Sequence, residues 1–249
     1  MAIRLVFHGG LTGLLNDRDG CSETTRELFR SAPVKDLIES QGIPHTEVGR
    51  IESHGAERSF AHLPTWGETL DILPPRPPVD VTLSTVLFPE PFDEVSFVAD
   101  ANVARLGGLL RLTGFDCLLD PRWDDAEIAE VAGDNKRILL TRDKELLKRN
   151  RVLRGRLIRS GLPWDQLAEV IHFFGLRDRI DLFSRCPKCN VTLERTDKSA
   201  VIDQLEPLTR MMYDHFTLCP GCGQVYWSGS HHDRIREKLA SAFLQASKV

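Results

Sequence analysis

Short apolar runs alternate with amphipathic segments through the middle of the chain, and this alternation constrains the fold more than any other feature. The runs FVA, FDCLL, RILLT and RLIR are separated by segments whose apolar residues recur at helical spacing. Short strands joined through helices predict a parallel sheet built from right-handed crossovers, an α/β fold. We expect strands at residues 97–99, 115–119, 137–141 and 156–159, and helices at 103–113, 125–132, 144–149 and 164–175.

Aspartates stand at the carboxyl ends of two of these strands. Asp100 follows the first strand, Asp143 follows the third, and Asp125 begins the helix that leads into the third. Ligands of an open parallel sheet lie outside the carboxyl ends of its strands. Carboxylate oxygens are the ligands that Mg²⁺ and Mn²⁺ prefer, so these three residues are candidate ligands of a divalent metal that engages phosphates.

Helix capping is the competing interpretation of each aspartate. Asp100, Asp125 and Asp143 all stand next to a predicted helix start, where Asp is a preferred N-cap residue. Capping alone shows little preference among Asp, Asn, Ser and Thr, yet all three positions carry Asp. Their shared identity favours a common ligand, and capping stays open as the alternative.

Cations cluster just after Asp143. Arg142 and Lys144 flank that residue, where they either balance its charge or contact a phosphate. The following stretch, residues 148–159, contains six basic residues and no acidic one, which suits either a solvated edge or a surface that contacts the phosphates of a nucleic acid. Its basic residues are Lys148, Arg149, Arg151, Arg154, Arg156 and Arg159.

Composition and charge divide the chain into three segments. Residues 1–94 carry 8 basic and 15 acidic residues (8 − 15 = −7) and end in a proline-rich connection, whereas residues 185–249 carry 9 and 7 (9 − 7 = +2). We therefore predict domains at 1–94, 95–184 and 185–249. No apolar run approaches the roughly 20 residues of a membrane helix, and no secretory leader is evident, so we predict a cytoplasmic protein that does not bind membranes.

The most specific local motif is a pair of Cys-x-x-Cys sequences. Cys186 and Cys189 are separated from Cys219 and Cys222 by 29 residues. Two such knuckles form a closed tetrahedral site, so we predict a structural Zn²⁺ that organises a ribbon and activates no water. Two cysteines remain, Cys21 and Cys117, and the apolar neighbours of Cys117 predict a buried thiol without a catalytic role.

Aromatic residues follow the last cysteine. Tyr226 and Trp227 either stack on nucleic-acid bases or, as we favour for Trp227, cover the small core beside the zinc. His231, Arg234 and Arg236 are candidate phosphate contacts.

These sequences resemble a known nuclease family. FVADANVARLGGLLRLTGFD, DDAEIAEVAGDNKRILLTRDKELLKR and RCPKCN…CPGCGQVYWSGSH look like the PIN-like ribonuclease domain named for the C-terminal region of the Mut-seven exonucleases. The resemblance covers residues 97–239. The first segment resembles the ubiquitin-like β-grasp domain that sometimes precedes this nuclease, chiefly through VKDLIESQGIPHTEVGRI. The implied architecture is a PIN-like parallel sheet flanked by helices, between a β-grasp domain and a four-cysteine zinc ribbon.

The resemblance implies a Mg²⁺- or Mn²⁺-dependent ribonuclease, with Asp100, Asp125 and Asp143 in the metal-binding positions. Asp124 is the neighbouring alternative to Asp125. PIN nucleases commonly add a further acid, for which this chain offers Asp116 and Asp120.

Other functions remain as alternatives. One is a non-catalytic RNA- or ribosome-associated adaptor that binds through its zinc ribbon, and a more distant one is a phosphoacceptor receiver domain. We also expect the N-terminal domain to bind a protein partner.

Overall fold

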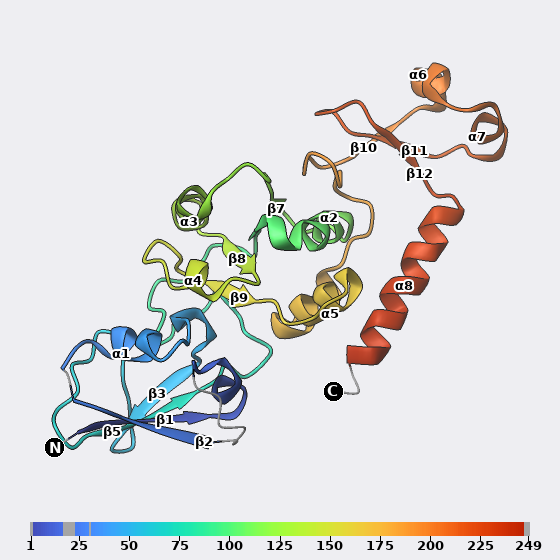
Figure 1. Cartoon of the computed structure of the whole chain (residues 1–249). Helices are drawn as coiled ribbons and strands as arrows, with labels where there is room; N and C mark the ends of the chain where they lie inside the picture. The colour runs from blue at the N-terminus through green and yellow to red at the C-terminus, as the bar shows by residue number, and fades with distance from the viewer. Residues whose placement is uncertain (1, 17–22, 30, 247–249) are drawn as a thin grey trace.

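Three units follow one another along the chain (Figure 1). The computed structural model describes residues 2–16, 23–29 and 31–246. Cys21 lies outside these residues. Within the described parts of the chain, no helix combines the length and the apolar character needed to cross a membrane.

The N-terminal unit is a mixed sheet crossed by one helix. Its strand order is β2-β1-β5-β3-β4; β1 runs parallel to β5 and antiparallel to β2. The apolar residues of α1, among them Val34 and Leu37, are fully buried against this sheet. This is the β-grasp arrangement expected from the sequence. Its elements are β1 Ile3–His8, η1 Gly9–Leu14, β2 Glu23–Leu28, α1 Val34–Ser40, η2 His45–Glu47, β3 Arg50–Ser53, β4 Ala56–Glu57 and β5 Thr69–Leu73.

The central unit is an all-parallel sheet of order β7-β6-β8-β9, which confirms the predicted fold class. The predicted strands are all present, although the second is only two residues long and the fourth begins at Gly155. Its elements are β6 Phe97–Ala99, η3 Ala101–Val103, α2 Ala104–Leu112, β7 Cys117–Leu118, α3 Asp125–Asp134, β8 Ile138–Thr141, α4 Lys144–Leu147, β9 Gly155–Leu157, α5 Pro163–Phe173 and η4 Arg177–Arg179.

The two faces of this sheet belong to different cores. Phe97 and Leu140 face one core, which includes apolar residues of α2 and α5. Val98 and Leu139 face the other, which is continuous with the core of the N-terminal domain. All four residues of β8 are buried, as is typical of a parallel strand covered on both faces. The N-terminal domain therefore contributes to the covering of one face of the central sheet.

Gly107 explains how closely α2 approaches the sheet. A β-carbon at this position would lie 3.1 Å from the Ala99 β-carbon and 3.5 Å from the Cys117 sulfur. The absence of a side chain lets the helix approach β6 and β7, which offsets the low helix propensity of glycine. Cys117 is fully buried, and burial raises its thiol pKa to about 12, as expected for a structural residue.

The C-terminal unit is a three-stranded antiparallel sheet of order β10-β11-β12, followed by one long helix. That helix, α8, turns back from the ribbon and lies along α5 (Figure 1), where Leu239 enters the core of the central unit. The division at residue 185 thus groups α8 with the ribbon, although it packs on the central unit. The elements are β10 Glu194–Thr196, α6 Lys198–Val201, η5 Ile202–Gln204, α7 Pro207–Met212, β11 Phe216–Leu218, β12 Val225–Trp227 and α8 Ser230–Ala246.

Candidate nuclease site and metal centre

Two of the predicted acids meet at the carboxyl edge of the central sheet through Thr141, the last residue of β8. The Thr141 hydroxyl donates to Asp100 Oδ2 at 2.7 Å and accepts from the backbone N–H of Asp143 at 3.0 Å. Asn102 donates to the same Asp100 oxygen and to the Thr141 hydroxyl. Thr141 is fully buried. Neither Thr141 nor Asn102 was predicted from the sequence, although both stand within two residues of a predicted ligand.

Capping occupies only part of the Asp143 carboxylate. Its Oδ1 accepts from the N–H groups of Glu145 and Leu146, so Asp143 is the N-cap of α4, as the capping alternative predicted. Asp100 precedes η3 but makes no side-chain cap. Asp100 Oδ1 and Asp143 Oδ2 have no hydrogen-bond partner among the described residues. Each acid thus keeps one oxygen with which it could bind a cation.

Asp124, and not Asp125, caps α3. Asp124 accepts from the N–H groups of Ala126 and Glu127, and the Glu127 side chain accepts from the Asp124 N–H in return. These bonds hold the pKa of Asp124 below its usual range. The capping alternative for Asp125 is therefore wrong. Its carboxylate is half exposed and lies 3.7 Å from the Arg149 guanidinium.

Sheet topology separates the two candidates for a further acid. Asp116 precedes β7 and so lies at the amino edge, where it pairs with Arg137 at 2.8 Å. Asp120 follows β7, at the same edge as Asp100, and pairs with Arg122 at 2.6 Å. Hydrogen bonds from Arg122 lower the pKa of Asp120 to about 2. Of the two, only Asp120 lies at the edge of the predicted metal site.

The four cysteine sulfurs converge in the ribbon. They all lie within 4.8 Å of one another, with 3.2 Å between Cys189 and Cys219 and 3.7 Å between Cys186 and Cys222. Sulfurs at the corners of a tetrahedral Zn²⁺ site are about 3.8 Å apart, so the set could bind a zinc ion. Among the described residues, this is the only group of three or more such side chains placed closely enough to hold a metal.

Hydrogen bonds polarise this sulfur cluster. Burial raises the pKa of the Cys186 thiol, but the Tyr226 hydroxyl, 3.1 Å away, and backbone donors outweigh it and lower the value to about 6. Trp227 packs on the small apolar core of the ribbon, with its ring 6.4 Å from that of Phe216. Trp227 thus covers the core, as we favoured. The His231 side chain lies outside the described part of the structure.

Comparisons with known proteins identify the family. The family described as the Mut7-C RNAse domain matches residues 95–239, which is more than half of the chain. The chain belongs to the Mut7-C RNAse domain family. The family described as Mut7-C ubiquitin matches residues 1–80. No curated protein and no solved structure matches the chain. The resemblance drawn from the sequence is confirmed over both domains.

The basic run of this Mut7-C chain does not form one exposed stripe. Arg154 is buried, and Arg156 is largely buried where it donates to Glu47 at 2.7 Å. Glu47 is itself buried and belongs to the N-terminal domain; it also accepts from Arg159 at 3.1 Å. These cations therefore help to join the two domains.

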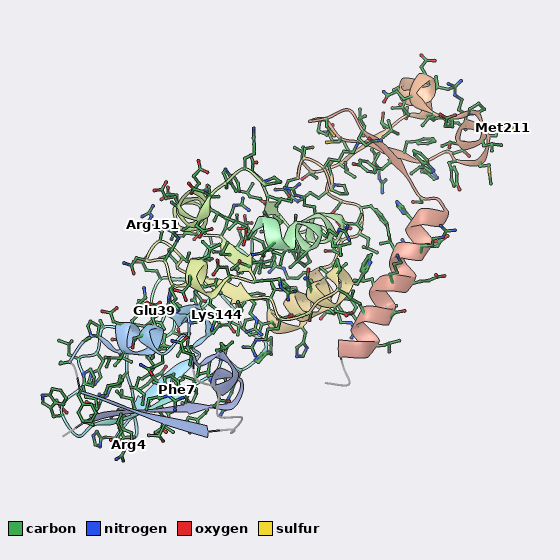
Figure 2. The ribbon with its side chains drawn as sticks, viewed as in Figure 1. Arg4, Phe7, Glu39, Lys144, Arg151 and Met211 are labelled. Carbon is green, nitrogen blue, oxygen red and sulfur yellow. The ribbon has the colours of Figure 1, made fainter. Side chains whose placement is uncertain are left out.

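The other predicted cations lie nearer the surface. Lys144 reaches across to the N-terminal domain and donates to the Leu14 carbonyl at 3.0 Å (Figure 2). Lys148 pairs with Glu145 at 2.7 Å, and Arg151 pairs with Asp134. Arg142, Arg149 and Arg151 are exposed, and Arg142 donates to the Ser160 carbonyl.

The first Cys-x-x-Cys knuckle of the Mut7-C chain is docked on the central sheet. Buried Arg111, from α2, donates to the carbonyls of Pro187 and Lys188 at 3.2 and 2.9 Å. Asn190 accepts from the Cys117 N–H and donates to Asp116. The ribbon therefore contacts the amino edge of the sheet, and Asp100 lies at the opposite edge.

Proposed function

We propose that the protein is a ribonuclease that hydrolyses RNA phosphodiester bonds with Mg²⁺ or Mn²⁺ held by Asp100, Asp125 and Asp143. Membership of the Mut7-C RNAse domain family supports the activity. The observation that carries the site is the position of the Thr141 hydroxyl, which donates to the Asp100 carboxylate and accepts from the backbone N–H of Asp143. It brings two acids from different strands to one edge and leaves each with an oxygen that accepts no hydrogen bond from the described residues.

The residues present suit a hard divalent cation. When bound, such an ion supplies an activated water and stabilises the charge that develops on the phosphate oxygens. Thr141 and Asn102 hold the Asp100 carboxylate in one orientation, while the α4 cap holds that of Asp143. Asp125, exposed and paired only loosely with Arg149, is the third proposed ligand. The three carboxylates do not lie close enough to form a ready-made metal site, so Asp125 would have to move toward the ion.

RNA binding is assigned to the exposed cations. Arg142, Arg149 and Arg151 lie in the segments beside α4, where they can contact several phosphates of one strand. Lys148, with 16% of its side chain exposed and Glu145 as its partner, is a secondary candidate. Lys144 and Arg159 are partly engaged by the N-terminal domain and are secondary candidates. Burial argues against this role for Arg154 and Arg156.

The experiment is cleavage of a single-stranded RNA with Mn²⁺ by the full chain. Asn caps helices as well as Asp does, so Asp143→Asn removes the charge and preserves the start of α4. We expect its rate to fall at least about 100-fold, the lower range for one group that stabilises developing charge. Asp178→Asn, in exposed η4, is the matched control and should cleave normally.

The same experiment separates the nuclease from the adaptor alternative. RNA binding without cleavage by the wild type would support the adaptor, as would equal cleavage by Asp143→Asn and the wild type. A metal-dependent rate that this one substitution removes would support the nuclease.

We further propose that Cys186, Cys189, Cys219 and Cys222 hold a structural Zn²⁺. The closed sulfur set leaves no coordination position for water, so the ion would stabilise the ribbon and its docking on α2. We expect one zinc per purified chain by elemental analysis, and none in Cys219→Ser. Cys117→Ser, which changes a sulfur outside the cluster, should retain the zinc. Zinc loss from both variants, or from neither, would contradict this assignment.

The N-terminal domain is proposed to bind a protein partner as well. Its family match supports that role, and among the described strands β2 and β4 form the edges of its sheet. Unpaired strand edges are a common route to pairing with another chain.

A further inference from the structure

A cavity of about 360 Å³ lies where the N-terminal domain, the proline-rich connection and the nuclease domain meet. Its walls include Val48 and Leu73 from the first, Val81 and Phe88 from the second, and Phe173 from the third. The volume falls in the range of small-molecule sites. Because all three segments contribute, the cavity exists only when the two domains are docked.

The guanidinium of Arg154 is the unusual group in this cavity. Arg154 lines it and is 93% buried, with 7% of its surface exposed. Its Nη2 is fully buried without a hydrogen-bond partner, and no acceptor among the described residues bonds its other nitrogens. The guanidinium lies 3.9 Å above the Phe88 ring. The ring attracts the cation but accepts no hydrogen bond from its N–H groups.

Arg156, two residues further along the chain in β9, is a largely buried arginine whose charge is balanced. It also lies over a phenylalanine, at 4.1 Å from the Phe173 ring. Unlike Arg154, it has two carboxylate partners, Glu47 at 2.7 Å and Glu169 at 3.7 Å. A buried guanidinium without an anion is costly, and burial alone lowers the pKa of Arg154 to about 10.

A second polar group in the same wall has no partner. The Thr46 hydroxyl is buried, and its oxygen makes no hydrogen bond. The charged residues that line the cavity are Arg50, Arg76 and Arg154 against Asp80, a balance of 3 − 1 = +2. Arg50 pairs with Glu52 and Arg76 is exposed to solvent, so Arg154 is the buried cation of this wall without an anion.

We propose that this cavity binds a small organic oxyanion, a carboxylate or phosphate attached to an apolar or aromatic body, with Arg154 and Thr46 as its polar contacts. The planar guanidinium presents paired N–H donors that suit the two oxygens of either anion. The body fits the apolar wall formed by Leu73, Val81 and Phe173.

The site is separate from the proposed nuclease site. Arg154 directly precedes β9 and lies at the amino edge of the parallel sheet, whereas Asp100 and Asp143 follow their strands at the carboxyl edge. A ligand here contacts both domains and stabilises their docked arrangement, since it binds only that arrangement. The proposal therefore does not depend on ribonuclease activity.

The test uses the full chain and three probes in isothermal titration calorimetry and thermal unfolding. Adenosine 5′-monophosphate supplies a phosphate on an aromatic body, benzoate supplies a carboxylate, and inorganic phosphate lacks the body. We expect saturable binding of at least one organic probe, tighter than inorganic phosphate, with a higher melting temperature. Which probe binds distinguishes a phosphate ligand from a carboxylate ligand.

Arg154→Met keeps the length of the side chain and removes its charge. We expect binding to weaken at least about tenfold, the loss typical of a hydrogen bond to a charged group. The melting temperature of the free protein should stay the same or rise, because a buried uncompensated charge is lost. A purely structural Arg154 would instead lower it. Arg105→Met, at an exposed arginine of α2 outside the cavity, is the control and should bind as the wild type does.

Thr46→Val provides a second variant of nearly equal shape, should Arg154→Met fail to fold. Loss of one neutral hydrogen bond should weaken binding about threefold or more. Binding of none of the three probes by the wild type overturns the proposal. Undiminished probe affinity in a folded Arg154→Met also overturns the proposal. If that variant does not fold, undiminished affinity in Thr46→Val overturns it.

Discussion

Glu47 should be the most sensitive single position for the docking of the two domains. Its side chain is 1% exposed and accepts from Arg156 at 2.7 Å, from Arg159 at 3.1 Å and from the Leu157 N–H at 2.8 Å. Glu47→Ala removes all of these bonds and leaves Arg156 buried with only Glu169, at 3.7 Å. The loss of stability should exceed the net stabilisation that these bonds provide, because the Arg156 cation stays largely buried without a close anion.

We expect Glu47→Ala to lower the free energy of unfolding by about 3–5 kcal/mol, the range for breaking a buried ion pair. The matched control is Glu27→Ala, which removes the exposed pair of Glu27 with Arg4, 3.2 Å apart. Both side chains of that pair are about half exposed, so we expect a change below about 1 kcal/mol.

Urea unfolding at neutral pH measures both variants. Circular dichroism reports the secondary structure of all units, while tryptophan fluorescence reports Trp66 in the N-terminal domain, Trp123 and Trp164 in the nuclease domain and Trp227 in the ribbon. Because the two domains share a core, the wild type should unfold both in one transition. A loss below about 1 kcal/mol in Glu47→Ala would refute the view that this carboxylate secures the interface.

Two further predictions concern the remaining contacts between units. Leu239→Ala, at a buried position of α8, should lower the free energy of unfolding by about 2–5 kcal/mol. Leu244→Ala, at an exposed position of the same helix, should change it by less than about 0.5 kcal/mol. Equal effects would contradict the docking of α8. Burial raises the pKa of Asp116, but hydrogen bonds from Arg137 and Asn190 outweigh it and lower the value. Its contribution to stability should thus be full above about pH 4, the unfolded pKa, and be lost as the pH falls through the lower folded pKa. Asp116→Asn should flatten this part of the acid-unfolding curve, and an unchanged curve would count against the pairing.

Local patterns were sufficient to predict much of the fold. The apolar runs located β6 and β8 to within one residue, because a buried parallel strand must be apolar on both faces. The two Cys-x-x-Cys motifs located the sulfur cluster, since each knuckle is a local turn. The aspartate at the end of β8 was located as well, with its capping role stated as the alternative.

Some local assignments needed atomic geometry. The cap of α3 fell on Asp124 and not on Asp125, because the reciprocal bond with Glu127 requires the residue three positions before it. Thr141 emerged as the link between two acids only once its hydroxyl was placed between them. Asp116 lay inside the predicted strand 115–119, and only the observed start of β7 at Cys117 placed it at the amino edge, opposite Asp120.

The sequence by itself determined which residues form the sheets, which sulfurs cluster and which acids end strands, because these follow from periodicity and short spacing. Only the tertiary structure decided what covers each surface. A run of arginines is equally basic whether it faces solvent or another domain, so sequence could not show that Arg156 meets Glu47 while Arg154 meets no anion. Nor could it show that α8 returns to α5. Contacts between distant segments depend on how the units dock, and no local pattern records that.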